Sequence, residues 1–76
     1  MRDMNRIEPF LTELGEVWKK YPDLRFGQLM FNFFSEFGDP FHLEEDEFLV
    51  AMKAHLSGEN PREAYLNYLK EKVQNE

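Results

Sequence analysis

The residue types best suited to chemistry gather in one segment, where four consecutive acids lie between the chain's two histidines: Glu44, Glu45, Asp46 and Glu47, between His42 and His55. Carboxylates and imidazoles bind divalent cations, so a small metal-binding domain is one hypothesis for this protein. Consecutive helical residues point in different directions, however, and no second acidic motif supplies opposing ligands. The run is better explained as the first turn of a helix, whose dipole favours negative charge.

Other chemistry has less support in the sequence. The chain has no cysteine, its serines, Ser35 and Ser57, have no neighbouring base, and its four glycines are scattered. A nucleophile needs an activating base, and a phosphate-binding loop needs clustered glycines. We therefore expect no enzymatic activity and no cofactor.

Phenylalanine and negative charge are concentrated in the middle of the chain. Seven of the eight phenylalanines lie between Phe26 and Phe48, and no lysine or arginine occurs from Phe26 to Met52. The same stretch holds six acids, whereas the acids and bases of the remaining residues cancel, so the formal net charge of −6 belongs to it. This acidity argues against direct nucleic-acid binding, which requires clustered lysine and arginine.

The length of 76 residues allows one domain, residues 1–76, whose stability must come from packing because disulfides are absent. Hydrophobic residues make up 42% and aromatic residues 16% of the chain, which favours a folded domain over disorder. No apolar run is long enough to span a membrane or resembles a signal peptide. We expect a cytoplasmic protein without a membrane partner.

The apolar spacing predicts four helices, at about 5–21, 24–37, 45–56 and 61–73, and hence an all-α bundle. The first has one apolar stripe: Ile7, Phe10, Leu11, Leu14, Val17, Trp18 and Tyr21. Asn5 or Asp3 is its expected cap, and Pro22 follows its end. The last has a strong start, with Asn60 as cap, Pro61 at the first position and Glu63 at the third.

The second predicted helix, 24–37, is apolar over more than half of its circumference. We therefore expect it to contact two neighbours and to lie at the centre of the fold. Gly27 is costly inside a helix, so we expect either a close backbone approach there or a helix that begins after Leu24. Phe31 and Phe34 form a strip beside the main apolar face, and this strip is either core or an exposed patch for a partner.

A longer pattern of residues lies between positions 15 and 48. It comprises Trp18, then Pro22, Asp23, Arg25, Phe26, Gly27, Gln28 and Leu29, then Asn32, and finally Asp39, Phe41, Leu43, Glu44 and Glu45. In this pattern the chain resembles small bacterial and prophage-encoded proteins of unassigned function, although His42 replaces the usual aromatic residue. The resemblance implies a helical fold and a bacterial or phage setting, and no activity.

Three functional hypotheses follow. The first is a non-enzymatic protein-interaction module, an inhibitor or adaptor that binds another protein or a second copy of itself. Its partner-binding residues would be Phe31, Phe34, Glu44, Glu45, Asp46 and Glu47. The second is an acidic nucleic-acid mimic that occupies the basic channel of a nucleic-acid-binding protein. The third is the metal-binding domain considered above.

Overall fold

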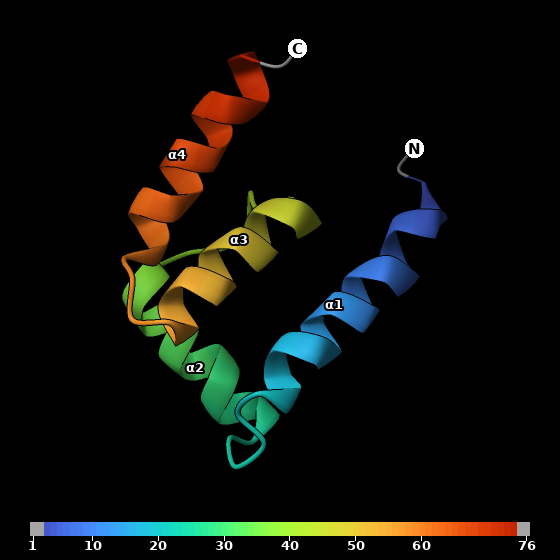
Figure 1. The fold of residues 1–76 in the computed structure, drawn as a ribbon, viewed down its shortest axis with the longest axis vertical. Helices are drawn as coiled ribbons and strands as arrows, with labels where there is room; N and C mark the ends of the chain where they lie inside the picture. The colour runs from blue at the N-terminus through green and yellow to red at the C-terminus, as the bar shows by residue number, and fades with distance from the viewer. Residues whose placement is uncertain (1–2, 75–76) are drawn as a thin grey trace.

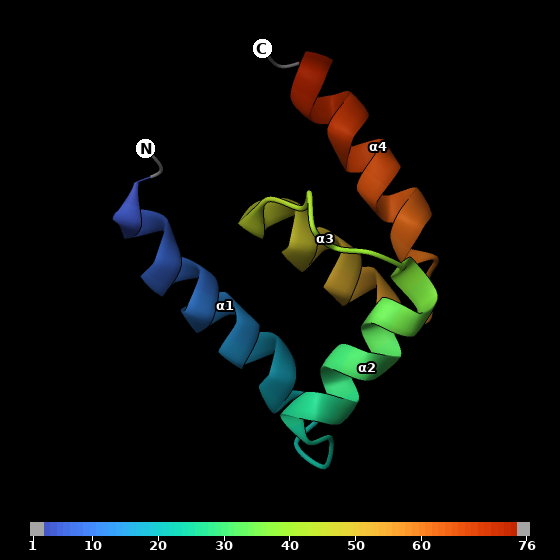
Figure 2. The same cartoon turned by 180° about the vertical axis from the view of Figure 1, so that it is seen from behind.

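The structure, a computed structural model, describes residues 3–74 and contains no strand among them. A 3₁₀ turn, η1 (Met4–Arg6), leads into α1 (Ile7–Lys19), and α2 (Phe26–Phe37), α3 (Glu45–Leu56) and α4 (Pro61–Gln74) follow. The predicted all-α fold is confirmed. α1 and α4 form two arms that diverge from the region of α2, and α3 lies between them (Figures 1 and 2).

The central helix is α3, not α2 as the sequence led us to expect. α3 packs against all three other helices, whereas α2 packs against α3 and α4. The residues that α3 buries are spread around it: Glu47, Leu49, Ala51, Met52 and Ala54. Two of them are alanines, whose small side chains let neighbouring backbones approach closely. The central helix is therefore α3, which has small buried residues, and not α2, which is the richest in phenylalanine.

The core is built around Phe33 of α2, whose side chain is fully buried. Its ring contacts the rings of Phe37 and Phe48, with centroids 5.4 Å and 5.2 Å apart, and the ring of His55 at 5.8 Å. Leu29 and Met52 are also fully buried in the same cluster. Aromatic pairs at these separations add to the free energy gained from burial alone. Phe33 thus joins α2 to both halves of α3.

α1 is covered less completely than its apolar stripe predicted. Of the seven stripe residues only Val17 is buried, while Ile7 and Leu11 keep 46% and 55% of their surface exposed. Phe10 still contacts Phe48 of α3, with ring centroids 5.6 Å apart. α1 packs on α3 and diverges from α4 (Figure 1), so part of its apolar stripe has no neighbour.

The joint between α1 and α2 explains where α2 begins. The indole of Trp18 donates a hydrogen bond of 2.7 Å to the carbonyl oxygen of Leu24, which fixes the turn. The side-chain oxygen of Gln28 accepts a 2.9 Å hydrogen bond from the Arg25 N–H, and α2 begins at Phe26. Gly27 is therefore in the first turn. A Cβ built there meets nothing within 4 Å, so the expected close backbone approach is wrong and the later helix start accounts for this glycine.

Several other helix ends follow the sequence signals, although α1 ends at Lys19, two residues before the predicted end at residue 21. Asp3, one of the two expected caps, accepts a hydrogen bond from the Asn5 N–H and caps η1. Gly38 ends α2 with a φ of 103°, and Gly58 follows α3 with a φ of 86°, a backbone conformation that favours glycine. Asn60 accepts hydrogen bonds from the Arg62 and Glu63 N–H groups, as expected of a helix cap.

Phe33 and Phe31 provide a matched pair of substitutions, because they lie two residues apart on the same helix with opposite exposure. We expect Phe33→Ala to lower the free energy of unfolding by about 3–5 kcal/mol, since it leaves a cavity in the core. A domain of this length has a total of roughly 4–11 kcal/mol. Phe31→Ala should change it by less than about 0.5 kcal/mol. Urea unfolding followed by circular dichroism measures both, and equal losses would contradict this description of the core.

The two glycines Gly27 and Gly38 should respond to alanine in opposite directions. Gly27→Ala should raise the free energy of unfolding by about 0.5–1 kcal/mol, because the site is helical and open. Gly38→Ala should lower it by about 1–2 kcal/mol, because alanine is strained at a positive φ. Thermal and urea unfolding of both variants test the pair. A destabilised Gly27→Ala variant would show that α2 begins differently.

Candidate functional site

The predicted acidic segment is the start of α3, and its acids are used within the fold. Glu44 is the N-cap of α3, and its N–H donates a 2.9 Å hydrogen bond to a carboxylate oxygen of Glu47, as part of a capping box. Glu45 accepts a 2.7 Å charged hydrogen bond from Nε of Arg6. This contact ties the first turn of α3 to the start of α1. The expected helix start with matched charge is therefore present.

The next two acids bind the end of α4. Nζ of Lys72 lies 3.0 Å from a carboxylate oxygen of Asp46 and 3.0 Å from one of Glu47. The Tyr68 hydroxyl donates a 2.6 Å hydrogen bond to the same oxygen of Asp46. Glu47 has only 6% of its surface exposed, so the ammonium of Lys72 supplies the partner that a buried carboxylate needs.

These contacts shift three pKa values. Burial by itself would raise the pKa of Asp46, but the hydrogen bonds from Tyr68 and Lys72 outweigh it and hold that pKa below its usual value. The hydrogen bond to Asp46 raises the pKa of the Tyr68 hydroxyl. The hydrogen bonds to Asp46 and Glu47 raise the pKa of Lys72. All three groups are thus stabilised in their neutral-pH forms.

Sequence reasoning found the acids but missed their partners. Tyr68 and Lys72 are four residues apart, so they share one face of α4. The connection from α3 to α4 is short, which makes the two helices antiparallel neighbours and brings the end of α4 beside the start of α3. That topological argument could have paired Lys72 with the acidic start. A partner-binding role remains a prediction for Glu44, Glu45, Asp46 and Glu47. The last three form ion pairs with cations outside α3.

The structure separates the two phenylalanines of the predicted strip. Phe34 is half-buried, and its ring lies near those of Phe33 and Phe48, at centroid distances of 5.3 Å and 6.4 Å. Phe31, one turn earlier on the same side of α2, keeps 73% of its surface exposed. The strip is thus core at one end and open to solvent at the other. The sequence alone had left both outcomes open.

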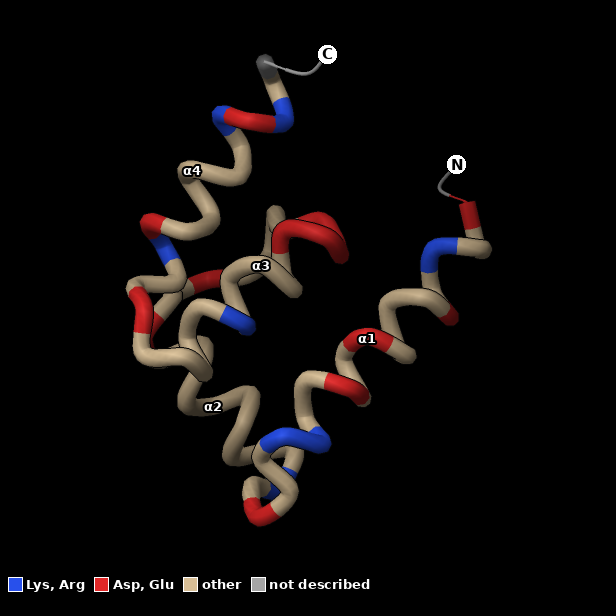
Figure 3. The backbone as a smooth tube through the Cα atoms, in the orientation of Figure 1, with Lys and Arg blue, Asp and Glu red and all other residues tan. Residues whose placement is uncertain are grey.

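The exposed side of α2 has an unusual composition. Apart from Phe31 it presents the uncharged polar residues Gln28, Asn32 and Ser35, all of them exposed. Glu36, also exposed, lies at its edge, where its carboxylate contacts His55. Ten consecutive residues, 26–35, contain neither an acid nor a base. Figure 3 shows the contrast with the acidic start of α3 and the mixed charges of α4. Protein surfaces usually carry charge on about a quarter to a third of their residues, so this face differs from an ordinary solvated one.

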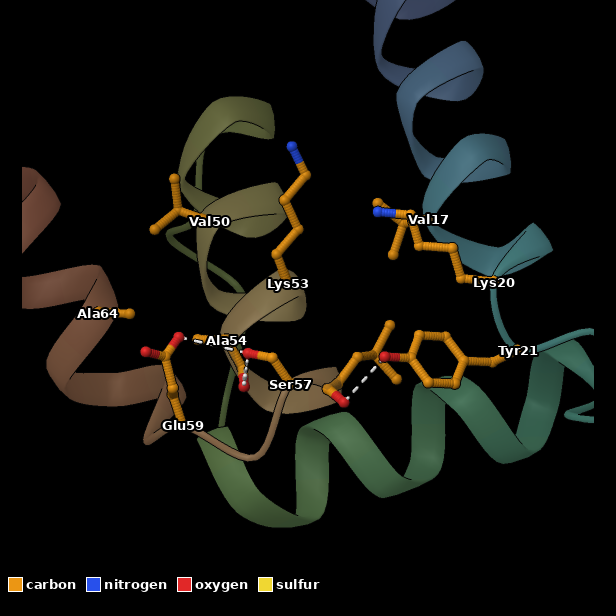
Figure 4. A pocket seen from close by; sticks show the side chains of 10 residues that line it. Val17, Lys20, Tyr21, Val50, Lys53, Ala54, Ser57, Glu59 and Ala64 are labelled. Atoms are coloured by element: carbon orange, nitrogen blue, oxygen red, sulfur yellow. Dashed lines mark hydrogen bonds between the residues drawn. The ribbon is translucent and has the colours of Figure 1, made fainter.

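A cleft of about 480 Å³ lies between α1, α3 and α4, and sequence reasoning did not find it. Figure 4 shows its lining, in which Val17, Val50 and Ala54 are apolar and the side chains of Lys20 and Lys53 lie beside them. The Tyr21 hydroxyl donates to the carbonyl oxygen of Leu56 at 3.1 Å.

The polar groups of this cleft serve the fold. The Ser57 hydroxyl donates to the Ala54 carbonyl oxygen at 3.1 Å and lies 3.3 Å from a carboxylate oxygen of Glu59. Lys53 lies 3.5 Å from a carboxylate oxygen of Glu13 on α1. These contacts close the end of α3 and brace α1 against it. They do not form the relay of nucleophile, base and orienting group that covalent catalysis needs.

The contacts of the two histidines are with residues other than the acids at the start of α3. Nδ1 of the half-buried His55 lies 2.5 Å from a carboxylate oxygen of Glu36, so its partner is a carboxylate on α2. His42 is exposed, with its ring 5.0 Å from that of Phe41. Within residues 3–74 no group of three or more histidine, aspartate or glutamate side chains is arranged to hold a metal ion. The metal-binding hypothesis therefore has no ligand set in this part of the chain.

Comparison with protein-family models, with curated proteins and with solved structures gives no match. The resemblance to small bacterial and prophage-encoded proteins accordingly stays a prediction. No helix in the described part of the chain is both long and apolar enough to cross a membrane.

Lys72 offers a test of the α3–α4 contact. We expect Lys72→Met to lower the free energy of unfolding at pH 7 by about 1–3 kcal/mol, because Glu47 would be buried without its partner. The matched control is Lys20→Met, since Lys20 is exposed and forms no ion pair within residues 3–74. The control should change the free energy by less than about 0.5 kcal/mol.

The same variant has a defined pH dependence. The pKa of Asp46 is lowered on folding, so its contribution is present above its unfolded pKa and is lost as the pH falls through the folded pKa. The contribution of Lys72, whose pKa is raised, is lost only at strongly alkaline pH. Wild-type stability should therefore fall as the pH drops below 3.8, the unfolded pKa of Asp46, and the stability of Lys72→Met should fall less steeply there. Parallel acid slopes in urea unfolding would show that the pair does not act in the folded state.

Proposed function

We propose that this chain is a small, acidic, non-enzymatic protein-interaction module of the cytoplasm, an inhibitor or adaptor of bacterial or phage origin. Its partner is another protein with an apolar pocket. The binding surface is the uncharged face of α2 centred on Phe31, which we call the α2 face: Gln28, Phe31, Asn32, Phe34 and Ser35.

The observation that carries the proposal is the exposure of Phe31 on a helix face without charge. An interface core is depleted in charged residues and enriched in aromatic ones, and the α2 face has both properties. An exposed phenylalanine with 73% of its surface in water has no role in the core, so its burial by a partner would be a net gain. The uncharged amide and hydroxyl groups beside it cost little free energy to desolvate if the partner supplies hydrogen bonds.

Phe34 supports the proposal by holding this surface in place. Its ring packs beside Phe33 and Phe48, so the turn of α2 that carries Phe31 and Phe34 is fixed on the core. A partner would meet a surface that is already ordered, which lowers the entropic cost of binding. An aromatic anchor on a rigid helix is typical of interaction hot spots.

The nucleic-acid mimic is less well supported than the interaction module. A mimic needs carboxylates that are free to meet the partner's basic residues. Three acids of the segment instead contact cations of the same chain: Glu45 contacts Arg6, and Asp46 and Glu47 contact Lys72. The acids therefore stabilise the fold and add the net negative charge that would steer the module toward a basic partner.

A photo-crosslinking amino acid at position 31 tests the proposal, with the same amino acid at position 41 as the matched control. Phe41 is exposed at 81%, so both positions are accessible, but Phe41 lies outside the α2 face. We expect one protein to crosslink through position 31 and not through position 41. With that partner purified, Phe31→Ala should weaken binding about tenfold or more, and Phe41→Ala by less than about twofold.

The salt dependence of the same binding separates the two functions. Binding through the α2 face should change by only a few fold between about 50 and 500 mM NaCl, whereas a mimic should lose affinity steeply. Equal crosslinking at both positions, or unchanged affinity of Phe31→Ala, would refute the proposed surface. Circular dichroism spectra confirm that each variant is folded.

A further inference from the structure

A second exposed apolar surface lies on α4, on the opposite arm of the molecule from α1. Leu66 and Val73 have 50% and 72% of their surface exposed, and with Leu69 and Lys70 they line one shallow hollow. We call Leu66, Leu69 and Val73 the α4 stripe. Tyr65, Tyr68 and Lys72, each one residue earlier, face the rest of the fold through Phe37, Asp46 and Glu47. The α4 stripe therefore flanks the buried side, with Leu66 and Val73 exposed and Leu69 half-buried.

The spacing of the stripe is that of a helix-pairing seam. Leu66, Leu69 and Val73 are separated by three and four residues, the spacing of the a and d positions in a heptad. On the same register Glu63 and Lys70 occupy successive e positions, along the outer edge of the seam. Both are exposed, and neither forms an ion pair within the described part of the chain.

We propose that the α4 stripe pairs with the α4 stripe of a second copy in an antiparallel, two-fold symmetric contact. With Leu66 facing Leu69 of the second copy, the e positions of the two helices lie side by side. Glu63 of each copy then lies beside Lys70 of the other, so both flanking charges are matched twice. A face that complements itself in this way is what a two-fold contact requires.

Charge also favours α4 over the rest of the surface for self-association. Two copies of a chain with a net charge of −6 repel each other. α4 carries three bases against two acids, and Figure 3 shows both signs along it. α4 itself therefore adds no net negative charge to a contact between two copies.

The size of the contact sets its strength. Stable complexes bury roughly 1,200–2,000 Å² in total, and two helices that touch over about three turns bury less. The contact is thus a weak dimer, with a Kd of roughly 10–100 µM. It is independent of the α2 face, so its failure would leave the proposed function unaffected.

A charge-exchange experiment tests the contact and its direction. Glu63→Lys gives a copy with lysines at both e positions, and Lys70→Glu gives one with acids at both. Each variant alone should dimerise about fivefold or more weakly than the wild type, because both flanking pairs become repulsive. An equimolar mixture should form a heterodimer at least as strong as the wild-type dimer, and the double variant Glu63→Lys/Lys70→Glu should restore self-association.

Sedimentation equilibrium from about 5 to 500 µM measures these affinities. Leu66→Lys should abolish dimerisation while circular dichroism stays unchanged, since Leu66 is half exposed. Leu11→Lys, at a similarly exposed position on α1, is the matched control and should leave the dimer intact. A wild-type chain that is monomeric throughout this range would overturn the proposal. So would single charge variants that dimerise like the wild type, or a mixture that fails to recover the dimer.

Discussion

The burial of α3 between the other helices is the constraint on which the positions of those helices depend. A helix that is covered on several sides must offer small residues where backbones come close and must pair any polar group that it buries. Ala51 and Ala54, both buried, are the small residues that allow backbones to come close. Glu47 is the buried polar group that must be paired, and the ammonium of Lys72 pairs with its carboxylate. The register of α4 on α3 follows from that pairing.

This arrangement explains why the acidic segment performs two tasks at once. The negative charge at the start of α3 complements the helix dipole, and the same acids attract the cations at the start of α1 and the end of α4. Carboxylates that hold a short chain together are less available for ligands. Concentrated charge is therefore weak evidence of function when the chain also has cations that the fold can bring to it.

The apolar surface left over is more informative than the charge. A chain of 76 residues buries a smaller fraction of its surface than a larger domain, and this one has more apolar residues than its core accommodates. Phe33 and Leu29 fill the core, whereas Phe31 on α2 and Leu66 and Val73 on α4 remain exposed. The two surfaces differ in their flanking residues. The α2 face has no charge and is proposed to bind a different protein, whereas the α4 stripe is flanked by an acid and a base and is proposed to pair with a second copy.

The sequence by itself determined the helical elements, because the signals for them are local. Asn60 with Pro61 marked the start of α4, since a helix cap depends only on neighbouring residues. The tertiary structure decided which helix is central, which cation meets Asp46, and how Phe31 differs from Phe34. Those outcomes depend on how far each helix face is covered by residues distant in the chain. Periodicity identifies an apolar face, but only packing decides whether anything lies against it.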